Sequence, residues 1–422
     1  MILLFSSVLH SISSGQQNNN LYTSYTTSQS RSHLYRNLVK VINKNLALPL
    51  NDSTEDLWQQ AFWAIELISY KQPWIEKKVQ TAFDSFLNRT LSFQQGLLEL
   101  ISNSYTGHFI HPVEEILWRT NDSRIFTISA AYLLQQNNDS VIAEITDLLQ
   151  TKFSAGIDTD PPLIMLRDQL KGLKSPETAS LKPVSLKELL SPHFLPGNII
   201  MYSFQRKNRN FPGLVIVRNA NGLFVTDSTG TIFNVPQLAR SITNLPEYIR
   251  NGNTPQGIFR MNGFDVSSNN FIGPSANIQL KLPFEVTPQK FLKDSSFTDT
   301  VWKIDHYKKL LPKDLQDYLP LYNSYYAGEA GRTEIIAHGT TVDPEYYKGT
   351  SYYPHTPSQG CLSTLEIWDG KLIKSDQQKL VGALLKAGGA NGYCVVLELD
   401  DNQHAVTLEE LIPYFSPRST VH

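Results

Sequence analysis

The chain has 422 residues and carries 37 Lys and Arg against 39 Asp and Glu, a formal net charge of −2. This length is too great for one ordinary core and predicts two or three folded units. Proteins that bind nucleic acid concentrate Lys and Arg, so the balanced charge predicts no nucleic-acid partner. The two cysteines, Cys361 and Cys394, are too few for a disulfide framework or a cysteine-rich zinc cluster, and we expect neither a metal nor a cofactor.

The N-terminus predicts an exported protein. An apolar stretch begins at Ile2 and continues through Ile12 before the chain turns small and polar, which resembles a secretory signal that lacks its basic region. The stretch from 16 to about 32 is rich in Asn, Ser, Thr and Gln and predicts a disordered leader, so residues 1–32 contain no folded unit in this prediction. No other stretch has the roughly 18 apolar residues of a membrane span. We therefore expect a periplasmic or cell-envelope protein without a transmembrane span.

A helical pattern dominates residues 33–173. Leu57, Ala61, Ile65 and Ile68 are spaced by four, four and three, which places them on one helix face, and Pro73 ends that helix. Further segments show the same periodicity, at Val79, Phe83 and Phe86, at Phe93, Leu97 and Ile101, and at Val141, Ile145, Leu148 and Leu149. The sequence therefore predicts an N-terminal all-α domain.

Four tryptophans of this helical region form a possible ligand-stacking set. Aromatic residues at helical spacing are more often core residues, so we expect Trp58, Trp63, Trp74 and Trp118 to pack inside the helical domain. Nothing else in the region carries identifiable chemistry. The partner of the helical domain is therefore left open.

A segment rich in Pro, Ser and Lys at 174–195 predicts a linker, and the composition changes after it. β-prone runs separated by Asn- and Gly-rich turns follow, at 198–204, 213–217, 223–227, 232–235, 257–261, 278–282, 334–338 and 393–399. Helices are expected at 313–319 and 375–387. The predicted fold class is therefore α+β and multidomain, with the all-α domain followed by a β-rich domain over 196–415.

Three short segments of the β-rich domain stand out by their order. They are Thr254-Pro255-Gln256-Gly257, then His338-Gly339, then Ser358-Gln359-Gly360-Cys361. In this order they resemble the L,D-transpeptidase catalytic domain, also known as the YkuD-type domain, whose hallmarks are a TPxG turn, an HG dipeptide and an S-x-G-C loop. The resemblance covers about residues 196–400 and implies a β-rich catalytic fold.

The chemistry of these residues agrees with the resemblance. A thiol with a free pKa of about 8.5 is mostly protonated at neutral pH, so a nucleophilic Cys361 needs a base, and the resemblance assigns that role to His338. It also implies that the main-chain carbonyl of Gly339 orients the imidazole. Gly360 allows close approach of a substrate, and the N–H groups of Gly360 and Cys361 are candidate oxyanion donors. Cys394 lies in an apolar, strand-like run and is expected to be a small core residue.

The chain departs from the family pattern around the cysteine. Gln359 stands where the family usually has His, and Ser363 stands where it has Arg or Asn. The segment between the histidine and the cysteine is also long and aromatic, which suits a lid that excludes water. Substrate contacts are expected from four residues of this region: Tyr353, His355, Ser358 and Gln359. Ser358 is equally suited to forming a turn, and His355 is a candidate to replace the missing histidine.

The resemblance implies a two-step acyl transfer on peptidoglycan stem peptides, with no metal. The Cys361 thiolate attacks the carbonyl of an L-residue, releases the terminal D-amino acid and forms a thioester, which an amine of a neighbouring strand resolves. Hydrolysis of the same bonds, by an L,D-carboxypeptidase or endopeptidase, is the alternative that uses the same machinery. A non-catalytic cell-wall-binding module is the alternative from another class, and the intact Cys and His pair argues against it. The family is generally acylated by carbapenems, so Cys361 is expected to gain one drug mass.

Overall fold

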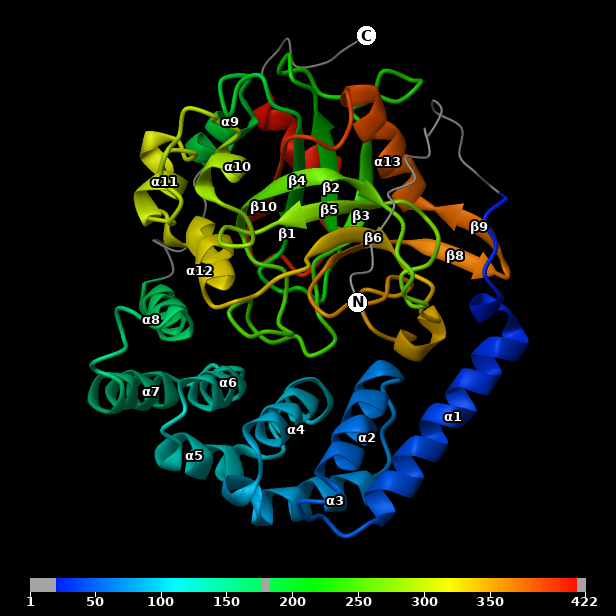
Figure 1. The fold of residues 1–422 in the computed structure, drawn as a ribbon, viewed down its shortest axis with the longest axis vertical. Helices are drawn as coiled ribbons and strands as arrows, with labels where there is room; N and C mark the ends of the chain where they lie inside the picture. The colour runs from blue at the N-terminus through cyan, green and yellow to red at the C-terminus, as the bar shows by residue number, and fades with distance from the viewer. Residues whose placement is uncertain (1–19, 176–182, 416–422) are drawn as a thin grey trace, which may run out of the picture.

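The computed structural model describes residues 20–175 and 183–415, which form a helical region followed by a β-barrel (Figure 1). The predicted helical region is confirmed, and its main helices are α1 (Ser28–Ala47), α2 (Glu55–Leu67), α3 (Pro73–Asp84), α4 (Leu91–Ser104), α5 (Ile110–Arg119), α6 (Ser123–Leu134), α7 (Asp139–Lys152) and α8 (Pro161–Lys174). The predicted export signal lies outside the described residues, as does part of the predicted linker, at 176–182. No helix within the described ranges is long and apolar enough to cross a membrane.

Burial of one apolar face fixes the position of α2. Ala61, Ile65 and Ile68 of the predicted face are buried, whereas Leu57 is only partly buried. The helix ends at Leu67, ahead of the predicted stop. Pro73 begins α3 instead, at a position whose N–H has no partner inside a helix.

Eight strands close into a barrel in the order β1-β10-β4-β5-β6-β7-β3-β2. Their bounds are β1 (Ile200–Gln205), β2 (Gly213–Arg218), β3 (Asn234–Leu238), β4 (Gly257–Asp265), β5 (Asn277–Lys281), β6 (Ile336–Gly339), β7 (Leu362–Thr364) and β10 (Tyr393–Glu398). The pairs β1/β10 and β6/β7 are parallel, and the other neighbouring strands are antiparallel. Strands β8 (Glu366–Asp369) and β9 (Lys371–Ser375) form a separate hairpin beside the barrel.

Alternate residues of one strand face different cores. On β1, Tyr202 and Phe204 belong to one apolar cluster and Met201 to another, as the two-residue period of a strand requires. The first cluster is covered by short helices, which are α9 (Pro183–Leu190), α10 (Pro288–Leu292), α11 (Ile304–Lys308), α12 (Asn323–Glu329) and α14 (Leu408–Leu411). Leu380 and Leu384 of α13 (Asp376–Ala387) contribute to the second cluster, and the predicted helix at 375–387 is confirmed.

The main differences from the predicted elements have local causes. The run at 223–227 forms only isolated bridges, at Phe224 and Thr226. The predicted helix at 313–319 is wrong, because a single 3-10 turn at Lys313–Leu315 is followed by extended backbone at Tyr318. The predicted linker contains α9.

Residues 20–32 are not a disordered leader, contrary to the prediction. The carbonyl of Leu21 accepts a hydrogen bond from the N–H of Leu372 at 3.0 Å, and the N–H of Thr23 donates to the carbonyl of Gly370 at 2.8 Å. This segment therefore extends the β8–β9 hairpin before α1 begins. Main-chain hydrogen bonds need no apolar side chain, which is why polar composition did not reveal them.

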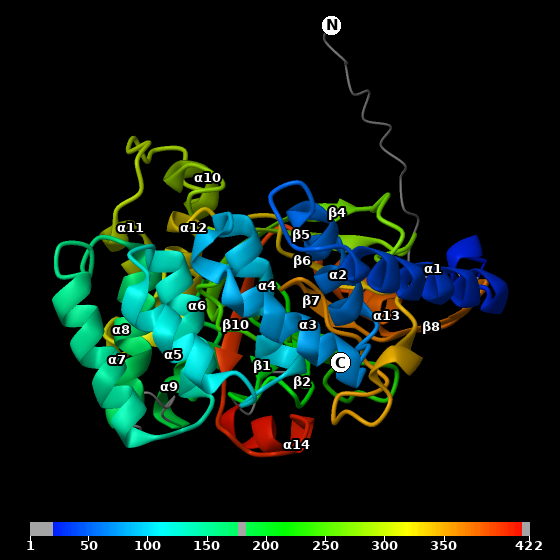
Figure 2. The ribbon, with the colours of Figure 1, turned by 90° about the horizontal axis from the view of Figure 1, so that it is seen from below.

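The helical region and the loops of the barrel share one apolar core (Figures 1 and 2). Two hydrogen bonds reinforce this interface. The Tyr347 hydroxyl donates to the carbonyl of Leu67 at 2.9 Å, and the Tyr248 hydroxyl donates to the side chain of Gln169 at 2.6 Å. The barrel part contributes eight residues to this core, which are Leu238, Ile242, Leu245, Tyr248, Ile249, Val342, Tyr347 and Tyr352. The helices thus pack as a layer against one side of the barrel.

Candidate active site

Strands β6 and β7 place the predicted nucleophile and the predicted base on one side of the barrel wall. They run parallel, with Ala337 opposite Leu362 and His338 opposite Ser363. Ala337 and Leu362 belong to the buried cluster that also contains α13. Because side chains alternate along a strand, His338 faces away from that cluster, and so does Cys361, the residue before Leu362.

The imidazole of His338 is held by the main chain next to it. Its Nδ1 lies 2.7 Å from the carbonyl oxygen of Gly339, and the side chain is 5 % exposed. A carbonyl oxygen only accepts hydrogen bonds, so Nδ1 carries the hydrogen when the ring is neutral, and Nε2 is the nitrogen that can take a proton. Burial lowers the pKa of His338 from its usual value, although the bond to Gly339 opposes this shift. The ring is therefore neutral and able to act as a base at neutral pH.

A buried carboxyl group makes glycine necessary at position 339. A Cβ atom on Gly339 would overlap the side chain of Glu366. Glu366 accepts hydrogen bonds from the hydroxyls of Ser275 at 2.5 Å and Ser375 at 2.6 Å, through the same carboxyl oxygen. Burial raises the pKa of Glu366 to about 7. The sequence did not single out Glu366, because its partner Ser275 lies far away along the chain.

Glu366→Gln is expected to stabilise the protein at about pH 8 and to leave its stability at about pH 4 nearly unchanged. The pKa of Glu366 is higher in the native state than its ordinary value of 4.5, so the native protein holds this proton more tightly than the unfolded chain does. Its contribution to stability is present below the unfolded pKa and is lost as the pH rises through the folded pKa. Glutamine stays neutral at every pH, so at about pH 8 the variant should keep up to about 3 kcal/mol of unfolding free energy that the wild type has lost. Urea unfolding of both proteins at the two pH values measures the difference, and equal stabilities at the higher pH would contradict it.

The thiol of Cys361 is partly buried and faces the start of β6. Its Sγ lies 3.7 Å from the carbonyl oxygen of Glu334. Burial raises the pKa of this thiol, whereas a hydrogen bond with the main chain of Ile336 and the charge of Arg332 lower it. No hydrogen bond among the described residues joins the thiol to His338. A proton can pass between them only when Sγ and the imidazole come within hydrogen-bond distance.

A buried arginine, which the sequence did not single out, packs beside Gly360 and holds the neighbouring TPxG loop in place. The guanidinium of Arg332 donates to the carbonyl of Asn253 at 2.7 Å and to that of Gly252 at 2.6 Å. Next to them, the hydroxyl of Thr254 donates to the carbonyl of Gly360 at 3.0 Å. Burial lowers the pKa of Arg332 to about 10. The Thr254 bond ties the TPxG segment to the S-x-G-C loop, so the role of Thr254 is to position that loop, while Arg332 fixes the chain just before the TPxG segment.

Ser358 forms the turn that leads to the cysteine. Its Oγ accepts a hydrogen bond from the N–H of Gly360 at 3.0 Å and donates one to the carbonyl of Cys361 at 2.8 Å. In this conformation the N–H of Gly360 is engaged and is not open to an oxyanion, contrary to the prediction. The N–H of Cys361 is then the candidate donor that remains from the predicted pair.

Gly360→Ala is expected to destabilise the fold and to slow acylation of the cysteine. Gly360 has a φ of +109°, and a Cβ atom there would overlap the guanidinium of Arg332 and the carbonyl oxygen of Gly252. We expect a loss of at least about 2 kcal/mol in urea unfolding. Gly349→Ala is the matched control, because Gly349 has a φ of +89° but no atom within 4 Å of its added Cβ. Equal losses in the two variants would show that the Arg332 contact is unimportant.

The remaining predicted contact residues are engaged within their own loop. The Tyr353 hydroxyl donates to the carboxylate of Glu345 at 2.8 Å, and Nδ1 of His355 lies 3.2 Å from the carbonyl oxygen of Tyr352. Burial lowers the pKa of His355, whose buried Nε2 has no hydrogen-bond partner. No hydrogen bond of the described residues links Tyr353 or His355 to the cysteine. The structure therefore does not bring these two predicted residues to the thiol.

The chemistry of this site is interpreted from its own geometry. No family model, no curated protein and no solved structure matches the chain. In the parts of the chain that the structure describes, no three His, Cys, Asp or Glu side chains are grouped to hold a metal ion. Cys361 and His338 are accordingly the groups from which a reaction can be argued.

The aromatic loop between His338 and Cys361 is anchored and does not form a free lid, contrary to the prediction. Tyr347 and Tyr352 are buried in the core shared with the helical region. The guanidinium of Arg240 also lies 4.8 Å from the centre of the Tyr352 ring. Movement of this loop would expose both tyrosines, so the core holds the loop in place.

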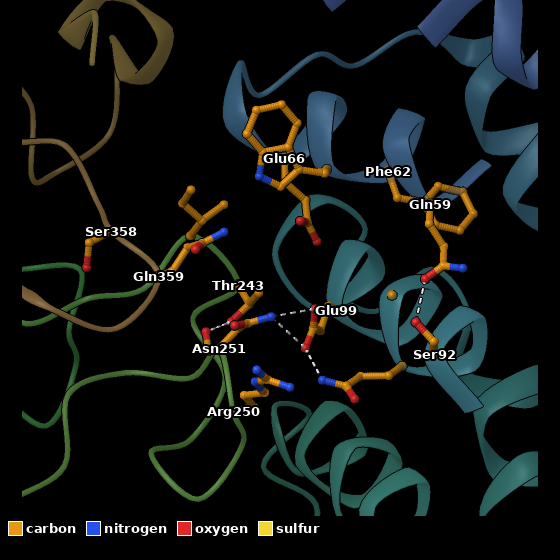
Figure 3. A pocket seen from close by; sticks show the side chains of 14 residues that line it. Gln59, Phe62, Glu66, Ser92, Glu99, Thr243, Arg250, Asn251, Ser358 and Gln359 are labelled. Carbon is orange, nitrogen blue, oxygen red and sulfur yellow. Dashed lines mark hydrogen bonds between the residues drawn. The ribbon is translucent and has the colours of Figure 1, made fainter. Parts of the chain in front are cut away.

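A cavity of about 400 Å³ lies between the helical region and the cysteine loop (Figure 3). Helices α2 and α4 form one side, and the barrel loops around Thr243 and Asn251 form the other. Ser358 and Gln359 complete the lining. Gln359 is exposed, and the cavity accounts for its predicted position at a binding surface.

Proposed function

We propose that the chain is a peptidoglycan L,D-transpeptidase of the cell envelope, which uses Cys361 as its nucleophile. The observation that carries this proposal is the hydrogen bond from Nδ1 of His338 to the carbonyl of Gly339. It leaves Nε2 as the basic nitrogen, on the side of the barrel wall that the cysteine also faces. The TPxG segment, the HG dipeptide and the S-x-G-C loop support it, since Thr254 connects the first of these segments to the last.

The first step of the proposed reaction forms a thioester. Nε2 of His338 takes the proton from Sγ of Cys361, and the sulfur bonds to the carbonyl carbon of an L-residue in the donor stem peptide. The negative charge on the carbonyl oxygen is stabilised by the N–H of Cys361. The C–N bond then breaks, and the imidazolium returns its proton to the amine of the departing D-amino acid.

The second step transfers the acyl group. An amine from a neighbouring stem peptide attacks the thioester carbonyl and gives its proton to Nε2 of His338. The C–S bond breaks, and the sulfur regains a proton. Attack by water at the same carbon gives hydrolysis in place of a cross-link, and the two outcomes differ only in the nucleophile that reaches the thioester.

Incubation with purified tetrapeptide muropeptides tests the proposal, with the products identified by mass spectrometry. We expect a cross-linked dimer together with the free D-amino acid, and neither product with Cys361→Ala. A trimmed tripeptide without any dimer would identify a hydrolase that uses the same residues. Absence of both products, together with binding to isolated cell walls, would identify a non-catalytic wall-binding protein and overturn the proposal.

A further inference from the structure

The cavity beside Gln359 contains two buried carboxyl groups that form no ion pair with any cation of residues 20–175 and 183–415. Glu66 projects from α2 and Glu99 from α4, both toward the barrel loop that carries Asn251 (Figure 3). Their side chains are only 8 % and 7 % exposed. Neither takes part in an ion pair within the described ranges. Buried carboxylates are normally paired or bound to a cation, so this arrangement needs an explanation.

Glu66 is the less satisfied of the two. Its Oε1 is buried and has no hydrogen-bond partner among the residues that the structure describes. Glu99 by contrast accepts from the amide of Gln95 at 2.7 Å and from that of Asn251 at 3.2 and 3.3 Å. Burial raises the pKa of Glu66 well above its usual range, and the charge of Glu99 raises it further. A cation bound between the two carboxylates would offset the cost of burying the Glu66 charge and the repulsion from Glu99.

The cations already present do not satisfy Glu66. Arg250 also lines the cavity, but its side chain is exposed, and its charge lowers the pKa of Glu99 only. The cavity is therefore acidic at its helical side, where α2 and α4 meet the barrel loops.

The lining of the cavity suits an organic ammonium group. Trp63 was expected in the helical core, but it is 38 % exposed and contributes to the cavity wall, and a tryptophan ring attracts a cation. Gln59 and Gln95 also line the cavity and offer amide oxygens to the three N–H donors of an ammonium. A volume of about 400 Å³ accommodates an aminoalkyl side chain, because ligand pockets begin at roughly 300 Å³.

The cavity is also close to the nucleophile. Gln359 lines it and is separated from Cys361 by a single residue, so the two Cα atoms are at most about 7 Å apart. We propose that this cavity binds a primary ammonium group of the substrate, carried by the side chain of a diamino acid, with Glu66 and Glu99 as its counter-charges. The identity of the substrate rests on the function proposed above. The binding of an ammonium group does not.

Binding of a small probe tests the cavity directly. Nα-acetyl-lysine carries one ammonium group, whereas Nα-acetyl-norleucine has a side chain of similar shape without it. Calorimetry on the full chain is expected to show binding of the first probe only, weakened about tenfold or more by Glu66→Gln and by Glu99→Gln. Glu115→Gln is the control, because Glu115 is half exposed on α5 and pairs with Arg119. Equal affinities in all four proteins, or equal binding of the two probes, would overturn the proposal.

Stability measurements separate loss of binding from loss of fold. Glutamine has the shape of glutamate but no charge to bury, so Glu66→Gln is expected to melt at the same temperature as the wild type or higher. If one variant melts lower, the other still tests the cavity, since the two carboxyl groups come from different helices.

Muropeptide kinetics identify which stem peptide supplies the ammonium group. If it belongs to the donor, Glu66→Gln raises the KM for thioester formation. If it belongs to the acceptor, thioester forms at the wild-type rate, and transfer declines in favour of hydrolysis. When the side-chain amine of the peptide that binds the cavity is acetylated, the wild type and Glu66→Gln should no longer differ in their kinetics with that peptide. Probe binding that depends on Glu66, without any thioester at Cys361, would refute the proposed function alone. Muropeptide turnover that is unaffected by Glu66→Gln and Glu99→Gln would refute the assignment of the bound ammonium group to the substrate, and absence of probe binding would refute the ammonium site itself.

Discussion

Cys361→Ala is expected to abolish both transfer and hydrolysis of muropeptides while the protein remains folded. The thiol lies at the edge of β7 and is partly buried, so its removal takes away the nucleophile without opening the barrel core. Turnover is measured by mass spectrometry of the products, and folding by circular dichroism and urea unfolding. A carbapenem adduct that persists in Cys361→Ala would show that another group is the nucleophile.

Cys394→Ala provides the control for this experiment. Cys394 is fully buried on β10, and burial raises its pKa strongly, so it is an inert part of the core. Its loss is expected to cost about 1 kcal/mol, similar to the loss of one buried methylene group. Activity should stay close to that of the wild type. Equal loss of activity in the two folded variants would mean that the assignment of the cysteines is wrong.

His338→Ala is expected to slow carbapenem acylation of Cys361 by about two to four orders of magnitude, the usual contribution of a positioned base. The physical reason is that burial raises the pKa of this thiol, so little thiolate is present unless Nε2 of His338 removes the proton. Intact-mass spectrometry over time gives the rate. His355→Ala is the matched control and should have a milder effect, because His355 is held within its own loop by the carbonyl of Tyr352, whereas His338 lies on the strand next to the cysteine.

The pH dependence of this reaction follows from the direction of the histidine shift. Burial lowers the pKa of His338, so the ring stays neutral below its usual value of 6.5. Acylation should therefore be constant around neutral pH and decline only at pH values below 6.5, as the imidazole gains its second proton. A larger loss of rate in His355→Ala than in His338→Ala would show that the base has been assigned to the wrong residue.

Local patterns predicted the long elements well and the short ones poorly. Helices α2 and α13 and strands β1, β2 and β10 contain enough residues to display a period. Strand β7 has three residues, Leu362–Thr364, and shows no alternation that a sequence pattern could detect. The segment next to Tyr22 joins the β8–β9 hairpin through its main chain, so its side chains gave no signal.

The site was predictable to the extent that it is local. His338, Gly339 and the cysteine loop belong to short motifs, and the predicted hydrogen bond between the imidazole and the carbonyl of Gly339 is present. Arg332 and Glu366 were missed, because the partners Gly252, Asn253 and Ser275 lie about 80 or more residues away in sequence. Buried polar groups of this kind find their hydrogen-bond partners only after distant segments have folded together, and the spacing of residues in the sequence does not show which segments will be neighbours.

The core shared by the helices and the barrel loops determines when the chain can finish folding. A ribosome delivers the N-terminal segments first, so α1 to α8 are made before Ile242, Tyr248, Tyr347 and Tyr352, which cover their apolar side. The helical layer therefore cannot complete its core during its own synthesis. The apolar side of the helical layer therefore stays exposed until Tyr352 has been synthesised. The cysteine loop follows Tyr352 in the chain, so it too can assemble only after that point.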